Sequence, residues 1–114
     1  LHLHAVKGLP RVQSIQNPYS LLNRSYEVGL AEISTREQCG LLAYSPLAMG
    51  LLSGKYFAGG TGRLSWMPEY FTRYQGSVAE EAARAYVDIA RQAGISPTQL
   101  ALAFVNQQPF VTSN

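Results

Sequence analysis

The sequence has a single cysteine, Cys39, and it lacks long apolar runs and runs of like charge. A lone cysteine excludes an internal disulfide and is typical of a reducing compartment such as the cytoplasm. The apolar runs are too short to span a membrane, which needs about 20 residues. The nine basic residues never stand side by side and the net charge is only +2, so no nucleic-acid partner is expected.

Several catalytic and nucleotide-binding signatures are also missing. No HExxH, GxSxG, Walker or GxGxxG pattern occurs, and the lack of the last argues against a Rossmann nucleotide site. His2 and His4 have no Cys, Asp or Glu close to them in the sequence, so we expect surface residues and no metal site. Cys39 is interpreted as a small packing residue, because no neighbouring His or Lys would activate its thiol.

Short apolar segments alternate with helical segments in the first half of the chain. Apolar spacing and turn residues predict the end of a helix over 1–7, a strand over 12–16, a turn at Asn17-Pro18, a helix over 25–39 closed by Gly40, and a strand over 41–44. A strand, a helix and a second strand in this order form a βαβ unit, which requires a parallel pair with a right-handed crossover.

The second half begins with a long segment, 45–76, that is richer in glycine and aromatic residues than an ordinary connection. Segments of this length are usually functional, and the aromatic residues predict packing against another part of the protein; they are Trp66, Tyr70, Phe71 and Tyr74. Helices are predicted over 77–94 and 96–106, with capping boxes at Ser77 with Glu80 and at Ser96 with Gln99, and a strand begins near residue 110.

Three strand–helix units are too few to close a barrel or a doubly wound sheet, and alone they would leave apolar strand edges exposed. The first residue is not Met, and the last residues read as an unfinished strand. We therefore expect 1–114 to be a fragment of one larger α/β domain.

The stretch 41–56, LLAYSPLAMGLLSGKY, carries the clearest signs of a binding site. Tyr44 ends a strand, where α/β barrels place their active sites, and its ring can stack on another flat ring. Ser45 and the N–H groups of residues 47–50 can bind a phosphate. Lys55 and Arg63 flank a glycine-rich loop, and both can bind a phosphate.

Gln16, at the end of the preceding strand, can hydrogen-bond a carboxamide through both ends of its amide. Each of these features also has a simpler interpretation. Tyr44 can cap the core, Ser45 and Gln16 can bond nearby backbone, and the two cations can be solvated surface residues.

Several linked motifs together resemble the aldo-keto reductase superfamily, most closely its Tas-like bacterial branch. They are IQNPYSLLNR at 15–24, AYSPL at 43–47, SGKY at 53–56, FTRY at 71–74, YVDIA at 86–90 and ALAFV at 101–105. Residues 45–56 also resemble the potassium-channel β subunits. The likeness covers nearly the whole chain.

The resemblance implies part of a (β/α)₈ TIM barrel that binds NADPH without a Rossmann fold. The strands at 12–16, 41–44 and 110–113 would be strands six, seven and the start of eight. By resemblance, Gln16 holds the nicotinamide carboxamide, Tyr44 stacks on the nicotinamide, Lys55 adds charge and Arg63 lies near the adenosine phosphate. The pyrophosphate passage would be lined by Ser45, Pro46, Leu47, Ala48 and Met49.

The family's catalytic Asp, Tyr, Lys and His lie on its first four strands, and the resemblance places none of them in this chain. The motif that grips the 2′-phosphate after strand eight is also absent. We expect a cytoplasmic NADPH-dependent reductase of small aldehydes or ketones as the parent, with the fragment itself inactive. A nicotinamide-binding regulatory subunit of the channel-β kind and a non-functional truncated remnant remain alternatives.

Overall fold

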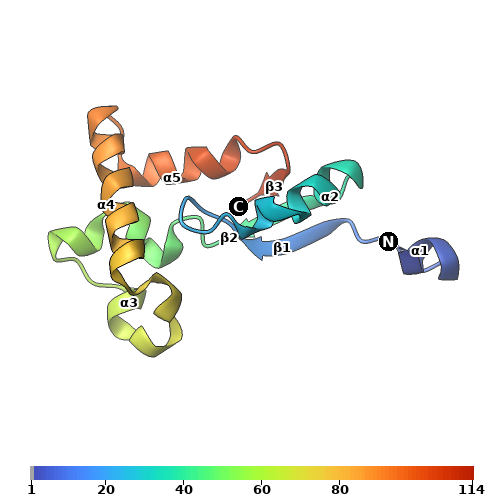
Figure 1. Ribbon diagram of the computed structural model, residues 1–114, viewed down its shortest axis with the longest axis horizontal. Helices are drawn as coiled ribbons and strands as arrows, with labels where there is room; N and C mark the ends of the chain where they lie inside the picture. The colour runs from blue at the N-terminus through green and yellow to red at the C-terminus, as the bar shows by residue number, and fades with distance from the viewer. Residues whose placement is uncertain (1) are drawn as a thin grey trace.

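Three parallel strands lie at the centre of the molecule (Figure 1). The computed structural model describes residues 2–114. Its sheet has the order β1-β2-β3, formed by β1 (Ser14–Pro18), β2 (Gly40–Tyr44) and β3 (Val111–Ser113). Leu41 of β2 lies beside Ile15 on one side and Val111 on the other. The predicted parallel pairing is therefore confirmed, and it extends to the third strand.

The turn predicted at Asn17-Pro18 is wrong, because both residues belong to β1 and lie beside β2. A residue before proline favours extended backbone, so Asn17 continues the strand. The chain turns a few residues later, where Ser20 and Asn23 exchange backbone hydrogen bonds of 3.1 Å. The strand consequently begins and ends two residues later than expected.

The helix predicted over 25–39 is divided into a 3₁₀ helix, η1 (Ser25–Val28), and α2 (Leu30–Arg36). The break falls at Gly29, whose φ of −166° is extended. Gly40 does not close this helix. Gln38, with a φ of +49°, takes the left-handed position, and Gly40 begins β2. A Cβ at position 40 would collide with the side chain of Thr112 on β3, so strand packing explains this glycine.

Five short helices occupy the long segment after β2. They are η2 (Ala48–Ser53), η3 (Lys55–Ala58), α3 (Arg63–Trp66), η4 (Pro68–Tyr70) and η5 (Thr72–Tyr74). The expectation that the aromatic residues of this segment all pack is only partly right. Tyr74 is buried, whereas Trp66 and Tyr70 are 71% and 81% exposed.

Two longer helices follow, α4 (Ser77–Gln92) and α5 (Pro97–Asn106), close to the predicted bounds. The capping box at Ser96 is confirmed, with the Gln99 N–H donating to the Ser96 hydroxyl at 3.1 Å and the Ser96 N–H donating to the Gln99 side chain at 2.9 Å. The prediction of a capping box at Ser77 is wrong. Gly76 is the N-cap there, and no side chain bonds to the helix end.

The buried residues form two clusters. The first lies between the sheet, η1 and α5, and its members include Tyr19, Tyr26, Leu41 and Val105. The second lies between η2, α4 and α5, and its members include Leu51, Leu52, Ala83 and Ala101. Cys39 is buried, as expected.

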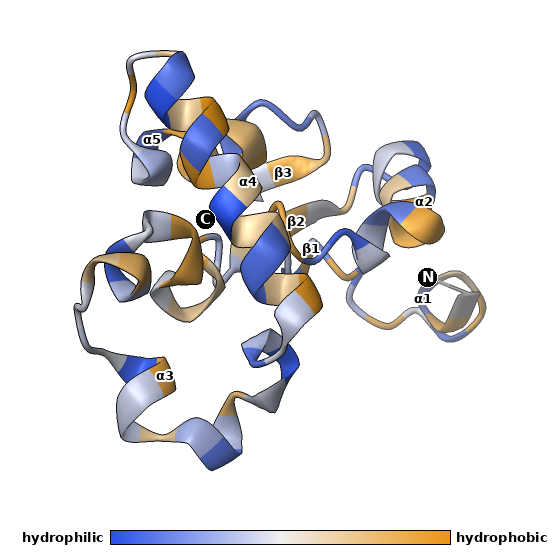
Figure 2. Ribbon diagram, turned by 60° about the vertical axis from the view of Figure 1, so that its left-hand side comes forward, coloured by the Kyte–Doolittle hydropathy of each residue, from blue (hydrophilic) through white to orange (hydrophobic). Residues whose placement is uncertain are grey.

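The molecule is extended, and its helices leave much apolar surface uncovered. Its radius of gyration is 16.6 Å, against about 13 Å for a compact domain of this length. The short helix α1 (His2–Lys7) lies at one end of the longest axis in Figure 1. Figure 2 shows apolar ribbon on α2, where Leu30 and Ile33 are exposed. This shape fits part of a barrel.

Candidate functional site

Tyr44 lies at the carboxyl end of the central strand, with 51% of its surface exposed. Parallel sheets bind ligands beyond the carboxyl ends of their strands. Three cavities meet at this residue, with volumes of about 580, 340 and 550 Å³. Tyr44 therefore lines all three cavities.

The 580 Å³ cavity, which we call the phosphate-side cavity, brings together most of the predicted site residues. It is lined by Tyr44, Ser45, Pro46, Leu47, Met49, Gly50, Lys55 and Arg63. Only two of the predicted residues do not line it. Gln16 is exposed on β1 beside Leu42, and Ala48 is fully buried in the core beneath the loop.

The loop after β2 has an unusual backbone. Ser45, Ala48 and Met49 have φ angles of +57°, +48° and +58°, and Gly50 follows at +92°. Left-handed conformations are costly for residues other than glycine and concentrate at ligand sites. The N–H groups of Ala48 and Gly50 donate at 2.9 Å to the carbonyls of Ser45 and Leu47. The sequence had suggested that the N–H groups of residues 47–50 bind a phosphate. The N–H groups of Ala48 and Gly50 are not free to do so.

Lys55 is held beside the phosphate-side cavity by its neighbours. Its ammonium lies 5.0 Å from the centre of the Tyr56 ring, a distance that suits a cation–π contact. The Tyr56 hydroxyl donates to the Met49 carbonyl at 3.0 Å and accepts from the Leu64 N–H at 3.3 Å. A Cβ at Gly62 would lie 2.7 Å from the Tyr56 hydroxyl and 3.0 Å from Lys55 Cε, so glycine leaves room for both side chains.

The three cavities around Tyr44 have positive charge that is not balanced locally. Their lining within residues 2–114 contains Lys55, Arg63 and Arg73 and no acidic residue. Lys55 and Arg63 both lie on the phosphate-side cavity. An aromatic ring and two cations on one cavity fit a ligand that carries both a flat ring and phosphates. The described residues hold no group of three metal-ligating side chains.

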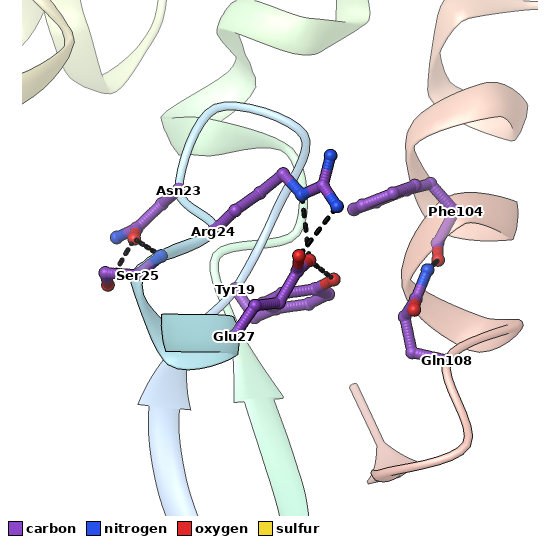
Figure 3. Close-up of polar contacts among 7 residues, drawn as sticks. All are labelled: Tyr19, Asn23, Arg24, Ser25, Glu27, Phe104 and Gln108. Atoms are coloured by element: carbon purple, nitrogen blue, oxygen red, sulfur yellow. Dashed lines mark hydrogen bonds and ion pairs between the residues drawn. The ribbon is translucent and has the colours of Figure 1, made fainter. Parts of the chain in front are cut away.

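A polar network holds the end of β1 against the site (Figure 3). The Tyr19 N–H donates to the Tyr44 carbonyl at 3.2 Å, and the Tyr19 hydroxyl donates to Glu27. Arg24 donates to both oxygens of Glu27, from Nε at 2.8 Å and from Nη2 at 2.6 Å. The Tyr19 ring stacks on Phe104 of α5, with ring centres 5.7 Å apart.

These contacts shift the ionisation of the network. Burial, followed by the bond to Glu27, raises the pKa of Tyr19, so its hydroxyl stays protonated. The hydrogen bonds from Arg24 lower the pKa of Glu27, which stays ionised. The network therefore consists of the neutral Tyr19 hydroxyl, the Glu27 carboxylate and the Arg24 guanidinium, which together hold the loop after β1 in place. It has no free group to act as an acid or base.

Sequence reasoning missed several residues of the other two cavities at Tyr44. The 340 Å³ and 550 Å³ cavities both include Arg73, and the larger one adds Asn17 and Asn23. The sequence signals were the length and aromatic content of 45–76 and the family motifs at 15–24 and 71–74. They indicated functional segments without indicating which residues reach the site.

The profile of the Aldo/keto reductase family matches residues 2–114. The chain is 56% identical to "Protein tas" of Escherichia coli over 115 residues, which cover 99% of this chain and 33% of that protein. It is 31% identical to a "Putative voltage-gated potassium channel subunit beta" of Schizosaccharomyces pombe over 106 residues, covering 86% of this chain and 30% of that protein.

Among solved structures, the glycerol dehydrogenase AKR11B4 of Gluconobacter oxydans is similar at a TM-score of 0.71 and 24% identity, over 94% of this chain and 34% of that one. This likeness supports the fold, a parallel α/β arrangement that fits part of a barrel. The chain spans about a third of the length of these relatives. No helix among the described residues is long and apolar enough to cross a membrane.

Proposed function

This chain belongs to the aldo/keto reductase family, and from that membership we propose that it is the cofactor-holding part of an NADPH-dependent oxidoreductase that reduces aldehydes or ketones. In this proposal residues 1–114 form part of one barrel domain of a cytoplasmic protein. The observation that carries it is the phosphate-side cavity, where an exposed tyrosine ring and two cations meet at a strand end.

Each residue of the cavity has a distinct part in the proposal. Tyr44 offers its ring to the nicotinamide. Lys55 and Arg63 hold phosphates, Arg63 through its planar fork. The passage between them is lined by Ser45, Pro46, Leu47 and Met49. Ala48 acts only by packing under the loop, because it is fully buried.

Gln16 stands apart from this group. It lies on β1, next to β2, but does not line the phosphate-side cavity. Its contact with a carboxamide remains a prediction from the family resemblance. It requires the ligand to extend from Tyr44 across the end of β2 toward β1.

NADPH, when bound, supplies the hydride that reduces a carbonyl carbon. The residues of this chain bind and orient; by resemblance, the acid that protonates the carbonyl oxygen lies on strands outside it. We therefore propose that the isolated chain has no reductase activity, and that the parent acts on a small carbonyl compound without metal, membrane or nucleic acid.

A second candidate is a regulatory subunit that binds the nicotinamide cofactor and reports its state to a partner. The likeness to the Schizosaccharomyces pombe β subunit favours it. The same cavity would serve both functions, because both need the cofactor. The two differ in whether turnover follows binding.

Titrating the complete protein with NADPH, followed by aldehyde-dependent NADPH oxidation, tests the proposal. Tight binding with turnover of small aldehydes is the expected result. Tight binding without turnover of any aldehyde would instead favour the regulatory function. Absence of NADPH binding would contradict both.

A further inference from the structure

Arg73 is a cation that lies beside Tyr44 but outside the phosphate-side cavity. It lines both the 340 Å³ and the 550 Å³ cavities, and Tyr44 lines both as well. It does not line the phosphate-side cavity, where Lys55 and Arg63 lie. The 340 Å³ cavity also shares Ser45 and Met49 with the phosphate-side cavity, whereas the 550 Å³ cavity shares only Tyr44 with it. Two cations therefore lie on the phosphate-side cavity, and a third, Arg73, lies on the 550 Å³ cavity that is separate from it except at Tyr44.

The position of Arg73 is set by an ordered turn. Its neighbour Tyr74 is 6% exposed and packs in the cluster between η2 and α4. The Tyr74 N–H donates to the Phe71 carbonyl at 3.1 Å, and the Gln75 side chain donates to the Pro68 carbonyl at 2.8 Å. The backbone that carries Arg73 is therefore anchored, although its side chain is exposed.

The charge of Arg73 is not neutralised within the described part of the chain. It forms no ion pair there, and no acidic residue among 2–114 lines either cavity that it borders. Glu27 is already bonded to Arg24 and Tyr19. The other polar groups of the larger cavity are the neutral side chains Asn17, Asn23 and Ser25.

We propose that Arg73 is a specificity-determining residue that binds a carboxylate on the carbonyl substrate. A guanidinium fork matches a carboxylate with two parallel hydrogen bonds, and the side-chain amides of Asn17 and Asn23 add neutral donors. The Ser25 hydroxyl adds none, because it donates to Asn23 Oδ1 at 2.8 Å. The proposal rests on the proposed function, since it assigns the substrate to the 550 Å³ cavity, which shares only Tyr44 with the phosphate-side cavity. The preferred substrates are acidic aldehydes or keto acids.

The test compares two aldehydes that differ only in charge, 4-carboxybenzaldehyde and benzaldehyde, with the complete NADPH-loaded protein. Arg73→Gln should lower kcat/KM for the acid about 10- to 100-fold, because charge-assisted hydrogen bonds contribute roughly 1.5–3 kcal/mol. The loss should lie in KM, with benzaldehyde unchanged. Arg73→Lys should recover part of the loss.

Arg36→Gln is the matched control, because Arg36 is an exposed arginine on α2 that pairs with Glu32. It should leave both aldehydes unchanged. A second readout needs no turnover: calorimetry should show that the protein binds 4-(hydroxymethyl)benzoate more tightly than benzyl alcohol, and that Arg73→Gln removes the difference.

Three results would overturn the inference. The wild type could show no preference for the acid, Arg73→Gln could impair both aldehydes equally, or it could raise the dissociation constant of NADPH tenfold, which would assign Arg73 to the cofactor. If the wild type bound no NADPH, the proposed function would fail. The calorimetric comparison would still decide the role of Arg73, because it does not require cofactor.

Discussion

Arg24 forms a bidentate ion pair with Glu27, with Nε 2.8 Å from Oε1 and Nη2 2.6 Å from Oε2. The pair is only partly buried, with 55% of the Arg24 side chain and 28% of the Glu27 side chain exposed. Water therefore screens much of its charge interaction. The pair acts mainly by positioning. Glu27 also accepts a hydrogen bond from the Tyr19 hydroxyl, and the Tyr19 N–H donates to the Tyr44 carbonyl.

Glu27 should make stability depend on pH in the acid range. Its pKa is lowered in the folded state, so its contribution is present above the unfolded pKa of about 4.3 and is lost as pH falls through the folded pKa. Glu27→Gln should therefore lower the urea midpoint of the complete protein at pH 7, with a smaller deficit at pH 3. The control is Glu32→Gln on α2. An equal deficit at both pH values would show that the carboxylate charge is irrelevant.

Tyr44 should contribute to cofactor affinity through its ring. Removing a stacking ring costs roughly 1–3 kcal/mol, so Tyr44→Ala in the complete protein should raise the dissociation constant of NADPH about 10- to 100-fold. Tyr44→Phe keeps the ring and should bind almost normally. Turnover at saturating NADPH should fall less than affinity in the alanine variant. An unchanged dissociation constant, measured by fluorescence titration, would argue against stacking.

Gly62 should matter because it leaves room for Lys55. Its φ of 168° is extended, so alanine adds bulk without backbone strain, and that bulk meets the ammonium of Lys55 and the hydroxyl of Tyr56. The end of a lysine can move at little cost to stability, so we expect Lys55 to be displaced before Tyr56, whose hydroxyl is held by Met49 and Leu64. Gly62→Ala should therefore raise the dissociation constant of NADPH about 3- to 10-fold, for a contact of roughly 0.5–1.5 kcal/mol.

Gly29→Ala is the control for this prediction, since Gly29 also has an extended φ and no atom lies within 4 Å of its added Cβ. It should leave NADPH affinity unchanged. If Gly62→Ala lowered the melting temperature by many degrees, the effect on binding would be a folding defect and the explanation through Lys55 would be wrong.

The isolated chain 1–114 should not unfold cooperatively. Its sheet has two uncovered edges, β1 and β3, and its radius of gyration of 16.6 Å exceeds that of a compact domain. Urea titration followed by circular dichroism should give a broad transition with a small m-value. The purified chain should also fail to oxidise NADPH with any aldehyde. A sharp transition would show that this part of the barrel is a folding unit by itself.

Sequence reasoning succeeded where the physical cause is local. Ser96 caps α5 because its hydroxyl and the Gln99 side chain lie within one helical turn. The helix predicted over 77–94 ends at Gln92, and Gly94, with a φ of +70°, follows it. The same reasoning failed at Gly40, since the contact that requires glycine comes from Thr112 on another strand.

The sequence by itself determined the family, the parallel strands and the loop that places Tyr44, Lys55 and Arg63 on one cavity. These follow from sequence motifs and from the order of strands and helices along the chain. Only the tertiary structure decided that Arg73 lines two cavities beside Tyr44. Packing of Tyr74 into the cluster between η2 and α4 brings that turn back to the strand end. No local rule reaches across the intervening residues, because the free energy that closes such a loop comes from burying side chains distant in sequence.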